Sequence, residues 1–388
     1  MAGRQHIEYK NGKYYGYVDL GVDNNEDKDN IDEAKNALVF MAVALNFHWK
    51  VPLGYFLIKN LAAAERANLM NICLDLLNEC GVHCKSLTFD GASVNLSMCK
   101  LLGASYDYPN KFQPWFLNGS HGNIYTIWDA CHMLKLIRNA LGDREIFYTN
   151  DNNKIEWTYI AKLEKLQREE GLKAATKLSQ RHIHYQNEKM KVSLAAQTFS
   201  QSVSNALLFC RDINIKDFEG CEATAHFCLV INNVFDMLNS KNLVAKSELS
   251  RGLSPKNFKE FDEKSREYIE YLSQLRDAHG NLLIHSNRKT GFLGFIICLT
   301  TVLQLYQDLI INNYLKYILT YKLSQDHLEF FFSCIRRRGG NNNNPSSFQF
   351  QCAYRKLLVR NQIKETKNSN CLTVDGTSIL SVGCGTRI

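Results

Sequence analysis

Three acidic residues in this sequence follow or occupy elements that could carry them to one place. Asp19 lies at the end of the alternating segment KYYGYVDL, Asp90 follows the predicted strand 84–89, and Glu329 lies on an amphipathic stretch near the end of the chain. Carboxylate oxygens are hard ligands that suit Mg²⁺. Three of them at a sheet edge can hold two ions about 3.5–4 Å apart, the arrangement that breaks and joins phosphodiesters.

A single aspartate after a strand is more often a turn residue or a helix cap than a metal ligand. The chemistry therefore depends on the elements that position the three carboxylates. The strongest of these is the segment 324–337, which reads as a helix with two different faces and ends at Gly339 and Gly340. The apolar residues predicted on one face are Leu328, Phe331, Phe332 and Ile335. The residues predicted on the opposite face are Asp326, Glu329, Ser333 and Arg336.

An ordinary surface helix with a solvated acidic face would show the same pattern. The order of the other elements is therefore needed to distinguish a surface helix from one that carries a metal ligand. The predicted strands are 13–20, 37–45, 51–58, 84–89 and 123–128, and the predicted helices are 61–80, 94–102 and 131–141. Three antiparallel strands followed by alternating strands and helices is the layout of the ribonuclease H-like fold. Its first and fourth strands are neighbours, which would bring Asp19 and Asp90 together, and Glu329 is the best candidate for the third carboxylate on a late helix.

The middle of the chain has a different character. Residues 156–287 are rich in Lys, Glu and Gln, show helical periodicity and lack strand alternation. We therefore predict an α/β ribonuclease H-like mixed sheet interrupted by a large α-helical insertion. The predicted segments are 1–141 and 288–362 for the split sheet domain, 142–287 for the insertion, and 363–388 for a flexible tail.

Composition limits the class of protein. The chain has 388 residues, 45% of them hydrophobic and 22% charged, which is ordinary for a globular protein of two or three domains. The longest apolar run, 293–303, is too short for a membrane span, and the N-terminus lacks the apolar core of a signal peptide. Thirteen cysteines without a CxxC motif indicate reduced thiols, so we expect an intracellular protein. Because the apolar runs are short, we expect no membrane partner.

The charge balance permits a polyanionic partner. Lys and Arg number 46 and Asp and Glu 39, a formal net charge of +7. Some of the basic residues lie near the predicted carboxylate elements, and we expect them to line a path for DNA. They are Lys135, Arg138, Arg336, Arg337 and Arg338.

Several sequence blocks resemble the P-element transposase family, which includes the vertebrate THAP-domain proteins derived from it. The longest block is SQDHLEFFFSCIRRRGGNNNNPSSFQFQCAYRKLL, and YGYVDLG, WKVPLGYFL, TFDGASVN, WDACHMLKLIRN, KMKVSLAAQTFSQSV, FDMLNS and RKTGFLGF occur in the family's order. The resemblance implies a nuclear DNA transposase that acts on transposon ends and target DNA as a homo-oligomer. It implies a catalytic and metal-binding triad of Asp19, Asp90 and Glu329 with two Mg²⁺ ions. Asp129, which also ends a strand, is the reserve for the second aspartate.

The same resemblance implies GTP bound to the insertion. The sequence alone would not suggest a nucleotide, since the chain has no GxxxxGK[ST] phosphate loop. Lys189 and Lys191 would contact the phosphates, and Asp236 would accept from the guanine N–H edge. Asp326, one turn before Glu329, would connect nucleotide and active site. A carboxylate on a helix surface is an equally good interpretation of Asp236.

One feature of the family is missing from the sequence. No C2CH spacing precedes the first strand, so the sequence corresponds to a catalytic core without the zinc-binding THAP domain. Two other classes therefore stay open. The first is a catalytically inactive, domesticated module that binds DNA or protein, and the second is a regulatory GTP-binding protein.

Overall fold

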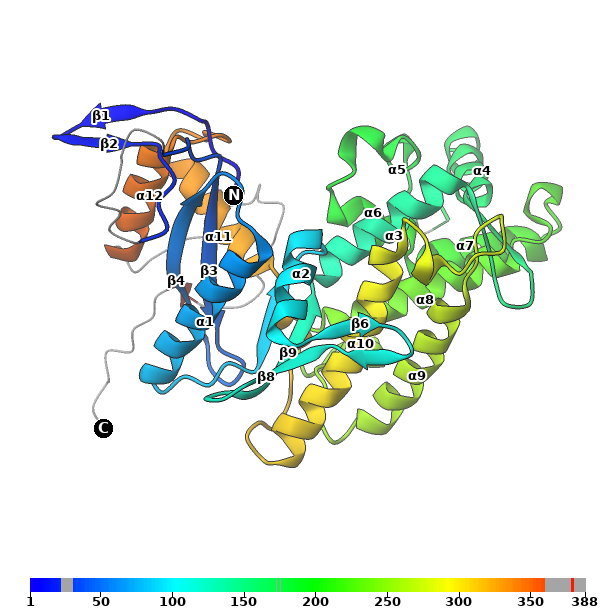
Figure 1. Cartoon of the computed structure of the whole chain (residues 1–388). Helices are drawn as coiled ribbons and strands as arrows, with labels where there is room; N and C mark the ends of the chain where they lie inside the picture. The colour runs from blue at the N-terminus through cyan, green and yellow to red at the C-terminus, as the bar shows by residue number, and fades with distance from the viewer. Residues whose placement is uncertain (22–30, 172, 175, 360–377, 380–388) are drawn as a thin grey trace. The chain divides into compact units, whose positions relative to one another are not determined.

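The computed structural model describes residues 1–21, 31–171, 173–174, 176–359 and 378–379. The chain divides into two compact units, one made of Met1–His83 with Gln325–Ile388 and the other of Cys84–Ser324. Figure 1 shows that the first unit combines elements from both ends of the chain, drawn in blue and orange. Two of the carboxylates of interest, Asp19 and Glu329, belong to this first unit.

The sheet of the first unit is built on the predicted strands 37–45 and 51–58. Strand β3 (Asn36–Val43) pairs antiparallel with β4 (Trp49–Ile58), and the short strand β12 (Ser378–Ile379) lies parallel to β4. Alternate residues of β3 and β4 point to opposite faces, as strand geometry requires. Both faces are apolar, which predicts helices on each side of the sheet.

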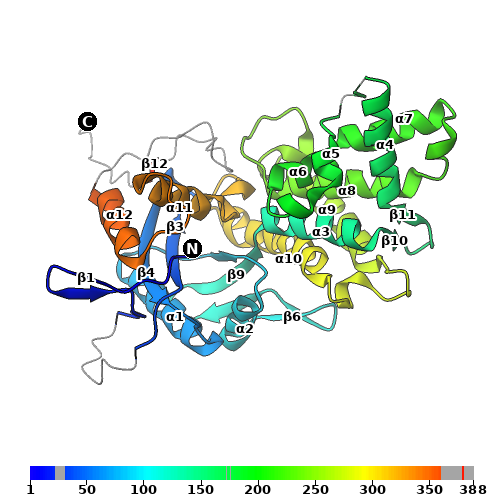
Figure 2. The same cartoon turned by 90° about the horizontal axis from the view of Figure 1, so that it is seen from above.

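Those helices are α1 (Ala63–Glu79) on one face and α11 (Asp326–Arg338) with α12 (Ser347–Val359) on the other (Figure 2). The core on the α11 and α12 side includes Val39, Leu57, Phe330, Phe331, Phe350 and Tyr354. The core on the other face includes Leu38, Phe40, Phe56, Ile58, Leu61 and Leu69. The unit is therefore a helix–sheet–helix sandwich in which α11, the predicted carrier of Glu329, is fixed by aromatic packing.

The buried face of α11 differs from the predicted one. The buried residues are His327, Phe330, Phe331, Cys334 and Ile335. Leu328 and Phe332, predicted to be central, are only half-buried. Because α11 packs against both the sheet and α12, its buried face is wider than a single stripe and is turned toward Phe330. Glu329 remains exposed, as predicted.

The predicted first strand, 13–20, is also different. Only Lys13–Tyr15 forms a strand, β2, which pairs with β1 (Glu8–Lys10) in a hairpin. Gly16 follows with a φ of +114°, a conformation that favours glycine, and its position against the backbone of His6 leaves no room for a Cβ. Beyond this bend Asp19 forms an isolated bridge to β4, where its N–H donates to the Leu57 carbonyl at 2.8 Å and its carbonyl accepts at 3.0 Å.

The second unit contains another three-stranded sheet. Strand β5 (Ser86–Phe89) lies parallel to β9 (Gly122–Trp128), and β8 (Trp115–Asn118) is antiparallel to β9. Helices α2 (Ser93–Leu102) and α3 (Ala130–Arg144) follow β5 and β9, as predicted. The hairpin of β6 (Ser105–Asp107) and β7 (Lys111–Gln113), like β8, was not predicted, because strands of three or four residues show too little alternation.

Helix α10 (Lys289–Tyr306) forms the core of this unit and packs on β9, α3 and α9. Gly291 and Gly294 allow the close approach, because a Cβ there would meet Ile137 and Met133 of α3. With the following π turn, the helix Lys289–Ile311 has 23 residues and contains an 18-residue window with a mean hydropathy of 1.6, enough to span a membrane by length and composition. The prediction that the apolar run 293–303 is too short for a membrane span therefore underestimated the length of the helix that contains it. However, 67% of that window is buried inside the protein, so the helix is weak support for a membrane span.

The rest of the second unit is mainly helical, as predicted for the insertion. Its elements are β10 (Ile146–Tyr148), β11 (Lys154–Glu156), α4 (Trp157–Glu169), α5 (Gln180–Ile183), α6 (Val192–Thr198), α7 (Gln201–Asp212), α8 (Glu222–Leu238) and α9 (Phe258–Gln274). The two compact units divide at His83 and Ser324, which are not the predicted limits of the insertion. This division by contacts does not test the boundaries at 141/142 and 287/288, which stay predictions. The predicted tail 363–388 lies outside the described residues except for β12.

Candidate active site

Asp19 lies where its chain segment leaves the sheet of the first unit. Its backbone is held by Leu57, its side chain is exposed, and its Oδ1 accepts from the Gly21 N–H at 2.9 Å. Within the described part of the chain, its Oδ2 accepts no hydrogen bond. The negative charge of Asp19 reaches Tyr55, whose pKa is raised mainly by burial and also by this carboxylate. Asp19 therefore combines a fixed backbone with an accessible oxygen.

Asp90 immediately follows β5 and precedes α2 in the second unit. Its Oδ1 accepts from the Asn95 side chain at 2.8 Å and from the Ala92 N–H at 3.3 Å. The residue is half-buried, and its Oδ2 accepts from none of the residues that the structure describes. Asn95 thus orients the carboxylate and leaves one oxygen available, which is the arrangement expected of a metal ligand with an outer-shell partner.

Glu329 lies in the first turn of α11 and is exposed. Two residues earlier, His327 is buried, and its Nδ1 lies 3.4 Å from the Nζ of Lys50 on β4. Lys50 is 1% exposed and also lies over the Phe330 ring, with its Nζ 5.9 Å from the ring centroid. The first turn of α11 is therefore joined to the sheet by polar and aromatic contacts, which fixes the backbone that carries Glu329.

Asp129, the reserve candidate, has a structural role. It is 3% exposed and is the N-cap of α3, where its Oδ2 accepts from the His132 N–H at 2.9 Å. Helix caps of this kind satisfy backbone donors that have no partner within the helix. His132 is itself partly buried; burial lowers its pKa, as does nearby Lys135, while Asp90 raises it. The geometry favours Asp90 over Asp129 as the accessible carboxylate.

This difference gives a first prediction. Asp129→Ala should lower the free energy of unfolding by about 1 kcal/mol, because the α3 cap is lost, whereas Asp129→Asn should be nearly neutral, because Asn caps as well as Asp. Urea unfolding of both variants measures the difference. If Asp129→Asn keeps its stability but loses DNA cleavage, Asp129 is the ligand and Asp90 is not.

The donor types fit a hard divalent cation. Asp19, Asp90 and Glu329 offer only oxygen atoms, and the first two keep an oxygen that no described residue occupies. Among the described residues, no group of three or more His, Cys, Asp or Glu side chains is already gathered around one point. Asp19 and Glu329 belong to one compact unit and Asp90 to the other, so the triad remains a prediction.

Two residues of the predicted DNA path are buried, and this part of the prediction is wrong. Lys135 is 4% exposed and Arg138 is 0% exposed. The Arg138 guanidinium donates to the Asn139 side chain at 2.7 Å and to the Lys189 carbonyl at 3.0 Å, and it lies 4.6 Å from the centroid of the Tyr185 ring. Arg138 is enclosed by residues of the second unit, and neither side chain is exposed enough to contact a phosphate.

The three arginines at the end of α11 have a different environment. Arg336 and Arg337 are half-buried, and Arg338 is exposed. An Arg337 Nη2 lies 3.2 Å from the Cys334 sulfur, which directs this side chain back along the helix. All three lie in the last turn of α11, where positive charge is favourable at the helix C-terminus. They remain candidates for contacting a polyanion.

Three protein-family models match the chain. A TNP-like RNase H N-terminal domain matches residues 1–103, a TNP-like GTP-binding insertion domain matches 131–251, and a TNP-like RNase H C-terminal domain matches 321–355. The first match includes Asp19 and Asp90, and the third includes Glu329. A human relative, the DNA transposase THAP9, is 30% identical over 90% of the chain. The chain belongs to the P-element transposase-like family.

Two further similarities come from Drosophila melanogaster. The transposable element P transposase is 26% identical over 86% of the chain. The solved structure of the Drosophila P element transposase strand transfer complex matches 92% of the chain with a TM-score of 0.76 and 24% sequence identity, and this similarity supports the fold. The chain spans 39% of the human relative and 43% of the fly relative. The predicted ribonuclease H-like fold with a GTP-binding insertion domain is confirmed.

The insertion domain contains three of the four residues predicted to contact GTP. Lys189 and Lys191 are exposed, and Lys191 forms an ion pair with Glu188. Arg181 also pairs with Glu188, at 2.6 Å, and these contacts lower the pKa of Glu188 to about 2. Asp236 is half-buried on α8, and burial raises its pKa. The fourth residue, Asp326, lies in the other unit, in the first turn of α11.

Several residues that contact the candidate site residues or their helices were not predicted from the sequence. Asn232 donates to the Asp236 Oδ2 at 3.1 Å and accepts from the Gln201 N–H at 3.4 Å. Its spacing of four residues before Asp236 on one helix was a usable signal. The position of Asn95, five residues after Asp90, was a weaker sequence signal for the contact between these two side chains. The contact of Lys50 with His327 joins residues 277 positions apart and had no local signal.

Proposed function

We propose that this chain is the catalytic core of a DNA transposase that cleaves and joins strands through Asp19, Asp90 and Glu329. The observation that carries the proposal is the accessibility of Glu329 on a helix whose other face is packed into the core. It lies in the stretch matched to the RNase H C-terminal domain, while both aspartates lie in the matched N-terminal domain. The human relative is described as a DNA transposase, and the fly structure as a strand transfer complex.

The three carboxylates would hold two Mg²⁺ ions, which supply charge stabilisation at a phosphodiester and lower the pKa of a bound nucleophile. The protein's own contribution is position. Leu57 fixes the Asp19 backbone, Asn95 orients Asp90, and the core beneath α11 fixes Glu329. If the three carboxylates form one site, such preorganisation would offer negative charge to a metal ion without a conformational cost at the moment of cleavage.

GTP would bind the insertion domain with Lys189 and Lys191 on its phosphates and Asp236 on the guanine edge. Lys191 would have to exchange its ion pair with Glu188 for a phosphate, a change between two anionic partners. Asp236 already accepts from an amide N–H of Asn232, the kind of donor that a guanine edge offers. Asp326, in the same first turn as Glu329, would relate nucleotide binding to the active site.

DNA would contact the protein through Arg336, Arg337 and Arg338. Each phosphate neutralised by an arginine releases counterions, so affinity should fall steeply with salt. Replacing all three with Gln should reduce the slope of log affinity against log salt by about 3. Lys259→Gln is the matched control, because this side chain is 92% exposed on α9 in the other unit. A slope that is unchanged in the triple variant excludes this path.

The experiment that tests the proposal is a cleavage and strand-transfer assay on transposon-end DNA, with or without Mg²⁺ and with or without GTP. We expect Mg²⁺-dependent nicking and joining that GTP stimulates. Saturable DNA binding without cleavage in any condition would support the inactive, domesticated module instead. Guanine-nucleotide binding that survives removal of the three carboxylates, with no cleavage, would support the regulatory GTP-binding protein.

The same proposal includes a nuclear location and assembly into a homo-oligomer. Fluorescence microscopy of the tagged protein and sedimentation in the presence of transposon-end DNA measure these two properties. A cytoplasmic monomer that does not assemble on DNA would contradict both.

A further inference from the structure

The turn before Lys189 and Lys191 holds a carboxylate between two cations. Glu188 accepts from the Arg181 Nε at 2.7 Å and from the Arg181 Nη2 at 2.6 Å, one bond to each carboxylate oxygen. Lys191 forms an ion pair with the oxygen that accepts from Nη2. The planar fork of an arginine binds a carboxylate and a phosphate in the same two-bond manner. Glu188 therefore fills a position between these cations that also suits a phosphate.

The backbone around this cluster is fixed by buried side chains. Arg181 lies on α5, where the next residue, His182, is 2% exposed and places its Nε2 2.9 Å from the Gln197 Oε1 of α6. The 3₁₀ turn Tyr185–Glu188 begins with a fully buried ring, whose hydroxyl donates to the Asp143 carboxylate at 2.7 Å. Both ends of the segment between Arg181 and Glu188 are therefore held by the rest of the second unit.

The buried guanidinium of Arg138 supports the other side of the turn. Its Nη2 donates to the Lys189 carbonyl at 3.0 Å, and its Cζ lies 4.6 Å from the centroid of the Tyr185 ring. The Lys191 N–H donates to the Glu188 carbonyl at 3.0 Å, which closes the turn. Because these contacts hold the backbone, the charged side chains can exchange partners without unfolding the turn that carries them.

The cations of the cluster are accessible and outnumber the anion. The side chains of Arg181 and Lys191 are 59% and 44% exposed, and that of Glu188 is 22% exposed. Lys189 is exposed too and forms no ion pair with any residue that the structure describes. Exposed ion pairs contribute little to stability, so a ligand with several negative charges can replace the single carboxylate of Glu188.

Protonation of Glu188 cannot release the cations near neutral pH. The hydrogen bonds from Arg181, and then those from Lys191, lower the pKa of Glu188 to about 2, so this carboxylate stays ionised. The cations therefore become available only when another anion takes the place of Glu188.

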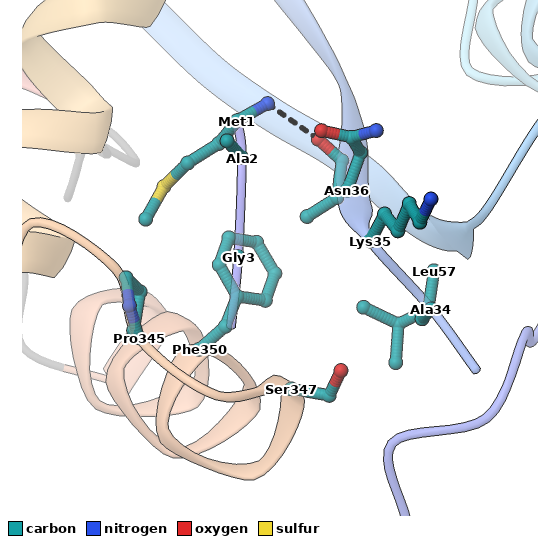
Figure 3. Close-up of a pocket in the computed structure, with 11 residues that line it drawn as sticks. Met1, Ala2, Gly3, Ala34, Lys35, Asn36, Leu57, Pro345, Ser347 and Phe350 are labelled. Carbon is teal, nitrogen blue, oxygen red and sulfur yellow. Dashed lines mark hydrogen bonds between the residues drawn. The ribbon is translucent and has the colours of Figure 1, made fainter. Parts of the chain in front are cut away.

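The small pocket of the first unit offers much less to an anion. Figure 3 shows that its lining includes Gly3, Pro345 and Phe350, with Lys35 as the basic residue among the lining side chains. The Gly3 N–H donates to the Lys35 carbonyl at 2.8 Å, and the Arg4 N–H donates to the Pro345 carbonyl at 3.0 Å. These backbone donors are thus already bonded within the protein, whereas the cluster around Glu188 has cations that a ligand can take over.

We propose that Glu188 holds the place of a nucleotide phosphate, and that a triphosphate displaces it and binds Arg181 together with Lys189 and Lys191. The inference rests on the proposed GTP site and adds two residues to it. Arg181 is a further phosphate ligand, and Glu188 is an internal anion that weakens nucleotide binding by competing for the same cations. An ion pair with only a structural role predicts the opposite, since its loss would loosen the turn and weaken binding.

Fluorescence anisotropy with ribose-labelled GTP, on the full chain without DNA, tests the proposal. Glu188→Gln keeps the shape of the side chain and removes its charge, so the labelled nucleotide should bind about two- to fivefold more tightly. Arg181→Gln should weaken binding at least about fivefold, because the fork is lost. Arg181→Lys keeps the charge without the fork and should give an intermediate affinity.

Two matched controls lie in the same unit. Arg266 is an exposed arginine that pairs with Asp262 at 3.0 Å, so Arg266→Gln controls for the loss of an ion-paired arginine. Glu170 is exposed and forms no ion pair within the described part of the chain, so Glu170→Gln controls for the loss of one negative charge. Both should leave the affinity unchanged. Arg181→Gln decides the question independently if Glu188→Gln does not fold.

Competition by inorganic tripolyphosphate separates this inference from the proposed GTP site. If tripolyphosphate competes as well as GTP and follows the same order of variants, the phosphate cluster stands and the guanine contact of Asp236 is wrong. If GTP binds but Glu188→Gln binds it equally or more weakly, the inference is overturned and the GTP proposal stands. Unchanged binding in Arg181→Gln, or no binding of either compound by any variant, also overturns the inference.

Discussion

Glu329→Gln is expected to abolish DNA strand cleavage while leaving the fold and DNA binding intact. The helix that carries Glu329 is fixed by Phe330, Phe331 and Ile335 on its other face, so the substitution keeps shape and position. It removes the charge that would hold a metal ion, and loss of such electrostatic stabilisation lowers rates by more than about a hundredfold. A Mg²⁺-dependent nicking assay with transposon-end DNA measures the loss.

The free energy of unfolding of Glu329→Gln distinguishes a catalytic role of Glu329 from a structural one. Glu329 is exposed in the first turn of α11, so Gln should change the free energy of unfolding by no more than about 1 kcal/mol through the helix dipole. Glu79→Gln, an exposed glutamate at the end of α1, is the matched control and should cleave normally. A Glu329→Gln protein that cleaves at the unmodified rate would remove this residue from the site and point to Asp326.

Asp90→Asn should have an effect of similar size. The amide oxygen can still accept from Asn95 and the Ala92 N–H, so the turn between β5 and α2 should persist. The oxygen that no described residue occupies becomes an uncharged NH₂ group, which cannot bind a metal ion. Cleavage should therefore fall by more than about a hundredfold with a change in unfolding free energy below about 1 kcal/mol.

The control for this substitution is Asp107→Asn, an exposed aspartate at the end of β6 in the same unit. Removing the outer partner with Asn95→Ala should give an intermediate loss of about 10- to 100-fold, because the carboxylate remains but is less well oriented. Full activity in Asp90→Asn, combined with lost activity in Asp129→Asn, would exchange the roles assigned to these two aspartates.

The elements that carry the candidate site could largely be predicted from local pattern. The antiparallel pair β3 and β4 and helices α1 to α3 follow from alternation, helical periodicity and glycine punctuation. The aspartates were found because each lies at the end of a predicted strand. The bend at Gly16 was missed because alternation continues through it, while the backbone contact with His6 that requires it is not visible in sequence.

Burial was the hardest property to predict. Lys135 and Arg138, three residues apart on α3, have the spacing of a basic helix face. Both are buried. Arg138 is covered by Tyr185 and Lys189, and helix α10, also distant in sequence, packs on α3. The buried face of α11 was misplaced for the same reason, since α12 adds a second packing partner that a periodicity argument for one helix cannot include.

If Asp19, Asp90 and Glu329 bind metal at one site, Fe²⁺ in place of Mg²⁺ should bind there too, and hydroxyl-radical mapping locates the bound iron. Radicals generated at a bound iron cut the backbone only nearby. We expect cuts beside Asp19, Asp90 and Glu329 in the same protein, suppressed by excess Mg²⁺ and lost in Glu329→Gln. Cuts at other positions, or a pattern that Glu329→Gln leaves unchanged, would contradict it.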